Sequence, residues 1–163
     1  MIIINDAHLH LLTNHIPVVG IPLIAILLAW GLLGRHDAVI RIALIGAVLM
    51  GPLTWLAAWS GHEAEEVVEE TAWQSHDRIH EHEELGEKAE WAAYITAALA
   101  LGALVLSRGS APRRGAAGVA LLGLVGSSVL LAMTSYEGGK IRHDEVHGVA
   151  PDAGQERGPR APS

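Results

Sequence analysis

Four long apolar blocks, separated by polar stretches, constrain this chain more than any other feature. They cover roughly residues 16–34, 38–60, 91–107 and 115–136. At about 1.5 Å of rise per residue, a helix of 17–23 residues crosses a hydrocarbon core roughly 30 Å thick. The runs from Ile16 to Leu33 and from Gly115 to Ala132 carry no charge, so a soluble helix made from them would have no face to give to water. The pattern therefore predicts an all-α, integral membrane four-helix bundle.

The block boundaries predict one transmembrane domain, residues 1–147, followed by a flexible C-terminal tail, residues 148–163. Its helices are expected at about residues 14–34, 38–60, 80–107 and 114–136. The third apolar block is short, so its helix is expected to begin in the polar run before Trp91. Asn14 is a candidate N-cap for the first helix. Gly138 and Gly139 are expected to break or bend the fourth helix where it leaves the membrane.

The charges of the connecting segments predict the orientation of the bundle. The first and third connections, with their flanks, carry five arginines and one aspartate, a net charge of +4. Residues 61–90 carry eleven acidic and two basic residues, a net charge of −9. Short cytoplasmic loops are enriched in Lys and Arg, so the arginine-rich connections are expected inside. Both termini and the acidic connection then lie on the outer, periplasmic side.

Histidine is the residue type that most suggests a site. Of the ten histidines, only His36 falls on the inner side of the predicted topology. The other nine fall at helix ends on the outer side: His8, His10, His15, His62, His76, His80, His82, His143 and His147. Neutral imidazole is the commonest metal ligand in proteins. Because the chain has no cysteine, thiolate sites and c-type haem attachment are excluded. The convergence of histidines from all four helix ends predicts a cofactor or metal site at the outer face.

Four sequence blocks carry a family resemblance. They are His8-Leu9-His10 with Asn14-His15-Ile16-Pro17, Gly61-His62-Glu63-Ala64-Glu65-Glu66, Ile79-His80-Glu81-His82-Glu83-Glu84 and Gly138-Gly139-Lys140-Ile141-Arg142-His143. In this order they resemble the signature of an uncharacterised bacterial family of small four-helix membrane proteins. That family is similar to a domain of unknown function sometimes joined to a Rieske iron–sulfur domain. His62 departs from the pattern, which has a glutamate there.

The resemblance has implications for location, chemistry and site residues. It implies a multi-pass protein of the bacterial inner (cytoplasmic) membrane, and by fold-level analogy redox work near quinol. It places weight on His10, His15, Glu66, His82, Arg142 and His143.

The leading functional hypothesis is a b-type haem held between helix ends near the outer face. Cytochromes use histidine as an axial ligand, and helix bundles commonly hold cofactors between facing helices. The predicted ligand pool is His10, His15, His82 and His143, with Arg142 as a partner for a haem propionate. The protein would then transfer electrons between quinol and a periplasmic acceptor.

Two alternatives stay open at this point. In the first, His10, His15, His82 and His143 with Glu66 and Glu83 bind a non-haem ion such as Fe, Cu or Zn, because eleven nearby carboxylates suit a cation better than haem propionates. In the second, the protein is a non-catalytic subunit of a respiratory or photosynthetic complex. No motif names a substrate, so an electron-transfer or accessory subunit is favoured over a stand-alone enzyme. The expected partners are the lipid bilayer, other membrane or periplasmic redox subunits and further copies of the chain, and not nucleic acid.

Overall fold

Four antiparallel helices make up the part of the chain that the computed structural model describes, residues 6–70, 76–106 and 110–142. The side-chain surroundings are described for residues 9–62, 80–106 and 114–139. The helices are α1 (Asp6–Gly34), α2 (Asp37–Glu70), α3 (His76–Val105) and α4 (Ser110–Arg142). Each contains a stretch of 26 residues that is long and apolar enough to cross a membrane. The predicted all-α membrane bundle is therefore confirmed.

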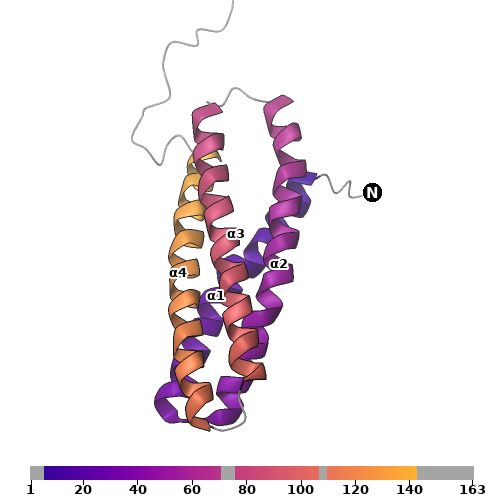
Figure 1. Cartoon of the computed structure of the whole chain (residues 1–163). Coiled ribbons are helices and arrows are strands. Elements are labelled where there is room, and N and C mark those ends of the chain that lie inside the picture. Colours follow the sequence, from indigo (N-terminus) through magenta and orange to yellow (C-terminus); the bar gives the residue numbers. More distant parts are fainter. Residues whose placement is uncertain (1–5, 71–75, 107–109, 143–163) are drawn as a thin grey trace, which may run out of the picture.

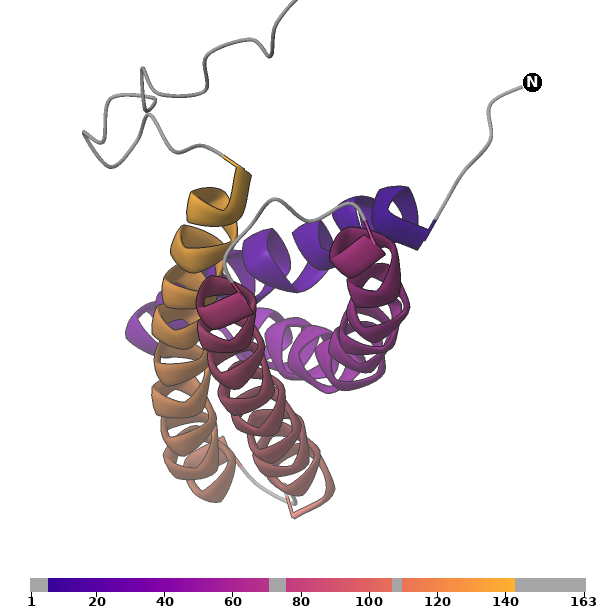
Figure 2. The ribbon, with the colours of Figure 1, turned by 90° about the horizontal axis from the view of Figure 1, so that it is seen from above.

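The helices form a ring in which each packs on two neighbours. Both α1 and α3 pack on α2 and α4, so α1 and α3 face each other diagonally across the bundle (Figure 1). Seen from above, α1 runs aslant to the other three helices (Figure 2). The starts of α1 and α3 and the ends of α2 and α4 lie at one end of the bundle (Figure 1). We call this the outer end and the opposite one the inner end, which places the predicted histidine-bearing segments together.

Small side chains fill the interior, while large apolar ones cover the surface. Ten of the sixteen buried hydrophobic residues are alanines. Leu33, Ile26 and Leu122 are instead 86%, 66% and 73% exposed, and many other large apolar side chains point outward in the same way. A soluble protein would bury these side chains, whereas lipid solvates them and small interfacial residues let helices approach closely. The distribution is that of a bundle surrounded by bilayer.

Glycines set the helix spacing in the middle of the bundle. A Cβ added at Gly51 of α2 would lie 3.1 Å from the Cβ of Ala97 of α3. One added at Gly123 of α4 would lie 2.6 Å from the hydroxyl oxygen of Thr96. A side chain at either position would force its neighbour to shift, so these glycines allow close packing of α2 on α3 and of α3 on α4.

A tight turn joins α1 to α2 at the inner end. The amide of His36 donates to the carbonyl of Gly31 at 2.9 Å, and that of Arg35 donates to Leu32 at 3.3 Å. This pair of hydrogen bonds is the Schellman cap, whose left-handed position is usually glycine. Arg35 occupies it here with φ of 56°. Close by, Arg114 of α4 forms an ion pair of 3.4 Å with Asp37 of α2.

The helices are longer at the outer end than the sequence analysis predicted. α1 begins at Asp6, so Asn14 lies inside the helix and the N-cap prediction is wrong. α4 continues through Gly138 and Gly139 to Arg142, so the predicted break there is also wrong. The residues Ala7 to Leu12 include no helix breaker, and Gly138 is retained in the helix because it packs against a side chain of α3. The extension of α1 puts His10 on a helix rather than on a loop, whereas His82 already fell within the predicted third helix. The predicted tail, residues 148–163, lies outside the described residues.

Candidate functional site: two cross-bridged histidines at the outer end

His10 of α1 lies against the last turns of the second membrane span. Its Nδ1 is 3.1 Å from the carbonyl oxygen of Ala57 and 3.3 Å from the hydroxyl oxygen of Ser60 on α2. The ring edge also contacts Gly61, where an added Cβ would lie 3.1 Å from the Cε1 of His10. The imidazole fits because α2 presents an alanine, a serine and a glycine at this point. A larger residue at position 61 would displace the ring.

His82 of α3 makes the equivalent contact with α4. Its Nδ1 is 2.9 Å from the carbonyl oxygen of Thr134. A Cβ added at Gly138 would lie 2.9 Å from the Cε1 of His82 and 3.2 Å from its Nδ1. The glycine one helical turn beyond the accepting carbonyl thus makes room for the ring, as Gly61 does for His10. The two histidines are held in the same way by two different helix pairs.

The acceptors of these hydrogen bonds decide the tautomers. A carbonyl oxygen accepts only, so each Nδ1 must carry the proton. In the neutral imidazole the Nε2 then bears a free lone pair. Within the described part of the chain, neither Nε2 has a hydrogen-bond partner. A histidine whose Nδ1–H is held by a backbone carbonyl, with Nε2 free, is in the state that metal-ligating histidines adopt.

His10 and His82 lie toward the same end of the bundle, on the diagonal helices α1 and α3. Their relative height follows from the layer in which Gly51 contacts Ala97. At about 1.5 Å per residue, Gly61 lies roughly 15 Å outward from that layer and His82 roughly 22 Å outward. Because His10 lies beside Gly61, the two histidines differ in height by roughly 7 Å. They come from diagonal helices, so the space between them is the centre of the bundle.

His15 and His62 lie differently from this pair. The Nδ1 of His15 is 2.5 Å from the carbonyl of Leu11, and that of His62 is 3.0 Å from the carbonyl of Ala58. Each acceptor is four residues earlier on the same helix, and both side chains are exposed. The structure does not bring His15, a predicted ligand, together with His10 and His82.

Of the predicted carboxylate ligands, only Glu83 has a described side chain. It is exposed and lies 3.8 Å from the exposed His80 of its own helix. The nearby Glu84 pairs with Lys88 at 2.7 Å. Within the described side chains no three of His, Cys, Asp and Glu come together as a metal would require. The side chains of Glu66 and Arg142, and the whole of His143, lie outside the described residues.

Exposed aromatic side chains lie on three of the helices toward the outer end, the tryptophans inward of the two histidines and Tyr136 near the level of His82. Trp55 and Trp59 of α2, Trp91 of α3 and Tyr136 of α4 are 45–59% exposed. Among the described side chains, Trp91 packs edge-on against Tyr94 of its own helix rather than against a histidine. Outward-facing Trp and Tyr at this height match the aromatic belt of a membrane interface. The histidine pair therefore lies at, or slightly beyond, the outer boundary of the hydrocarbon core.

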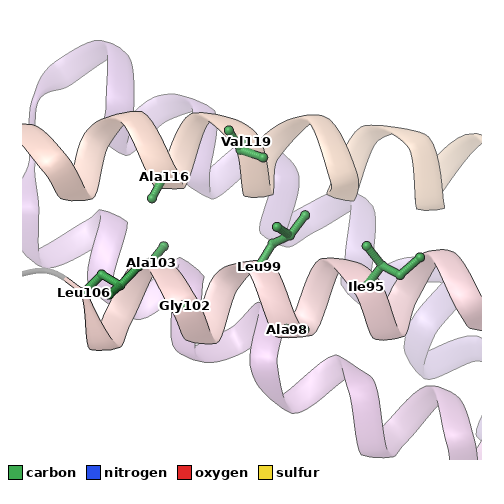
Figure 3. A pocket seen from close by; sticks show the side chains of 8 residues that line it. All are labelled: Ile95, Ala98, Leu99, Gly102, Ala103, Leu106, Ala116 and Val119. Atoms are coloured by element: carbon green, nitrogen blue, oxygen red, sulfur yellow. The ribbon is translucent and has the colours of Figure 1, made fainter.

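The structure also contains an apolar groove of about 460 Å³ between α3 and α4, away from the histidines. Its lining residues are Ile95, Ala98, Leu99, Gly102, Ala103, Leu106, Ala116 and Val119 (Figure 3). None of them titrates or binds metal. The groove is a seam on the membrane-facing surface and offers no chemistry comparable to the histidine pair.

Sequence reasoning did not predict which groups hold the two imidazoles. Ser60 contacts His10 and is itself bonded to Thr13, and Gly61 and Gly138 make room for the rings of His10 and His82. Their contacts cross between helices, whereas the sequence shows only that these residues are small.

Comparisons with known proteins add no information about the pair. No family model, no curated protein and no solved structure matches this chain.

Proposed function

We propose that this protein is a membrane cytochrome that binds b-type haem through the Nε2 atoms of His10 and His82. The observation that carries the proposal is the cross-helix hydrogen bond from each Nδ1–H to a backbone carbonyl. These bonds leave the Nε2 of both rings unprotonated, with a lone pair that can bind a metal ion, before any cofactor arrives. His10 and His82, on the diagonal helices α1 and α3, are the two residues that would hold the haem iron.

The pair suits haem better than a non-haem ion. Structural and catalytic zinc sites take three or four protein ligands, and a haem supplies four equatorial nitrogens of its own. Of the described acidic side chains on α3 near the pair, Glu81, Glu83 and Glu84 are exposed, and the last two interact with His80 and Lys88. Their charge is therefore screened by water, which weakens the argument that carboxylates would repel haem propionates. Arg142 remains the candidate propionate partner.

In this proposal the haem supplies one-electron redox chemistry, and the protein supplies the ligands, the apolar walls and the position. The site lies at the end of the bundle that the charge distribution assigns to the periplasm. A cofactor there is near both the quinol headgroups of the bilayer and a water-soluble acceptor. We infer electron transfer from quinol to a periplasmic acceptor in the inner membrane, in association with other redox subunits.

The test is an absorption spectrum of the detergent-purified protein, as isolated, after haem addition and after dithionite reduction. We expect a Soret band that shifts on reduction, with resolved α and β bands typical of two imidazole ligands. His10→Ala and His82→Ala should each lose this low-spin spectrum. His15→Ala and His62→Ala are the matched controls and should retain it, because both side chains are exposed. A protein that stays colourless with excess haem would overturn the proposal.

A further inference from the structure

A pair of buried hydroxyls lies beside His10 and has no counterpart at His82. Thr13 of α1 and Ser60 of α2 are 7% and 0% exposed, and their hydroxyl oxygens are 2.7 Å apart. Ser60 also donates to the carbonyl of Ala57 at 2.8 Å. That carbonyl is the one that the Nδ1 of His10 contacts. Carbonyl, hydroxyls and imidazole therefore form one network between α1 and α2.

The protons of this network can be counted. Thr13 and Ser60 contribute one hydroxyl proton each, and one of the two must lie between their oxygens at 2.7 Å. The carbonyls of Ala57 and Leu9 compete for the other, since each lies within 2.9 Å of a hydroxyl oxygen. The Nδ1 of His10, at 3.3 Å from Ser60, could receive that proton only in place of the nearer carbonyl of Ala57 at 2.8 Å. The network is complete only when Nδ1 itself carries a proton and donates it to Ala57 or Ser60.

The surroundings of His82 differ in this respect. The hydroxyl of Thr134 donates to Leu130 of its own helix, and only the carbonyl of Thr134 contacts the ring. A similar hydroxyl pair does occur elsewhere in the bundle. Thr96 and Ser127 are 3% and 0% exposed, with their oxygens 3.3 Å apart between α3 and α4. No histidine contacts that pair, so it provides a control of matched chemistry.

We propose that Ser60 and Thr13 are positioning residues that hold the ring of His10 against the carbonyl of Ala57 and so fix its orientation. They make His10 the more rigid of the two histidines, since His82 is held by one carbonyl and one glycine. The inference rests on the proposed function only in taking haem as the ligand that Nε2 receives. Groups that hydrogen-bond to a ligating histidine on the side away from the metal typically change metal affinity by about 10–100-fold when they are removed.

The experiment uses the full-length protein in detergent and two readouts. The first is the ¹⁵N spectrum of labelled histidine before haem is added, with the His10 signals assigned by their loss in His10→Ala. The wild type should give distinct signals for a protonated Nδ1 and an unprotonated Nε2. Ser60→Ala and Thr13→Val should bring these two signals toward a common value, because the ring can then turn away from the carbonyl of Ala57 and sample the second tautomer. Ser127→Ala should leave them unchanged.

The second readout is the rate of haem loss to an excess of apomyoglobin. We expect Ser60→Ala to raise this rate by about tenfold or more, with Ser127→Ala within twofold of wild type. Unchanged ¹⁵N signals in Ser60→Ala would overturn the positioning role, whether or not haem binds. Failure of the wild type to bind haem would instead overturn the proposed function and leave the ¹⁵N test of positioning intact.

Discussion

Gly138 offers the sharpest test of the site, because its neighbour Gly139 provides a control one residue away. A Cβ at Gly138 would lie 2.9 Å from the Cε1 of His82, whereas one at Gly139 would meet nothing within 4 Å. Carbon atoms in contact are about 3.5–4.0 Å apart, so Gly138→Ala must move the ring by at least about 0.6 Å. That movement can stretch the 2.9 Å bond to the carbonyl of Thr134 to as much as about 3.5 Å, at the limit of hydrogen bonding.

The two substitutions should therefore have different effects on stability and on binding. Replacing a helical glycine by alanine stabilises by about 1 kcal/mol, which Gly139→Ala should gain in full. In Gly138→Ala the lost hydrogen bond, worth about 1 kcal/mol, offsets that gain. Haem affinity should fall about 10–100-fold in Gly138→Ala, which is about 1.4–2.8 kcal/mol, and should not change in Gly139→Ala.

The assays are haem titration followed at the Soret band and denaturant unfolding in detergent followed by circular dichroism. The comparison of the two neighbours separates a local effect on His82 from a general effect of alanine in this last part of α4. Equal haem affinity in Gly138→Ala and wild type would refute the reasoning, as would an equal loss of affinity in both variants.

Two further predictions concern the bundle itself. Among the described residues, the hydroxyl of Thr54 is buried without a hydrogen-bond partner, so Thr54→Val should stabilise the protein by about 1 kcal/mol. The hydroxyl of Thr96 bonds to Ala92 and Ser127, so Thr96→Val should destabilise the protein by a similar amount. Denaturant unfolding in detergent measures both changes. Because the chain has no cysteine, single cysteines report orientation directly: a membrane-impermeant maleimide added outside intact cells should label Glu84→Cys and not His36→Cys. Labelling of position 36 alone would reverse the proposed orientation.

Much of the fold could be predicted from the amino-acid sequence because hydrocarbon imposes a strict rule on the backbone. Lipid offers no hydrogen bonds, so an apolar block long enough to span must be helical. Four such blocks with short connections determine an antiparallel bundle, and the acidic connection of residues 61–90 brings its histidines to one end. The outer helix ends were predicted too short, since the apolar signal stops at the membrane boundary while α1 and α4 continue as helices beyond it.

The sequence by itself determined the helical class, the four spans and the gathering of histidines toward one end of the bundle. Only the tertiary structure distinguished among the histidines. The sequence placed His10, His15 and His82 in one predicted ligand pool and left His62 out of it, but all four place Nδ1 near a backbone carbonyl. For His15 and His62 that carbonyl belongs to the same helix, and for His10 and His82 it belongs to a neighbour. The difference depends on which face of each helix meets a glycine of the next one, and that is set by packing between segments about fifty residues apart.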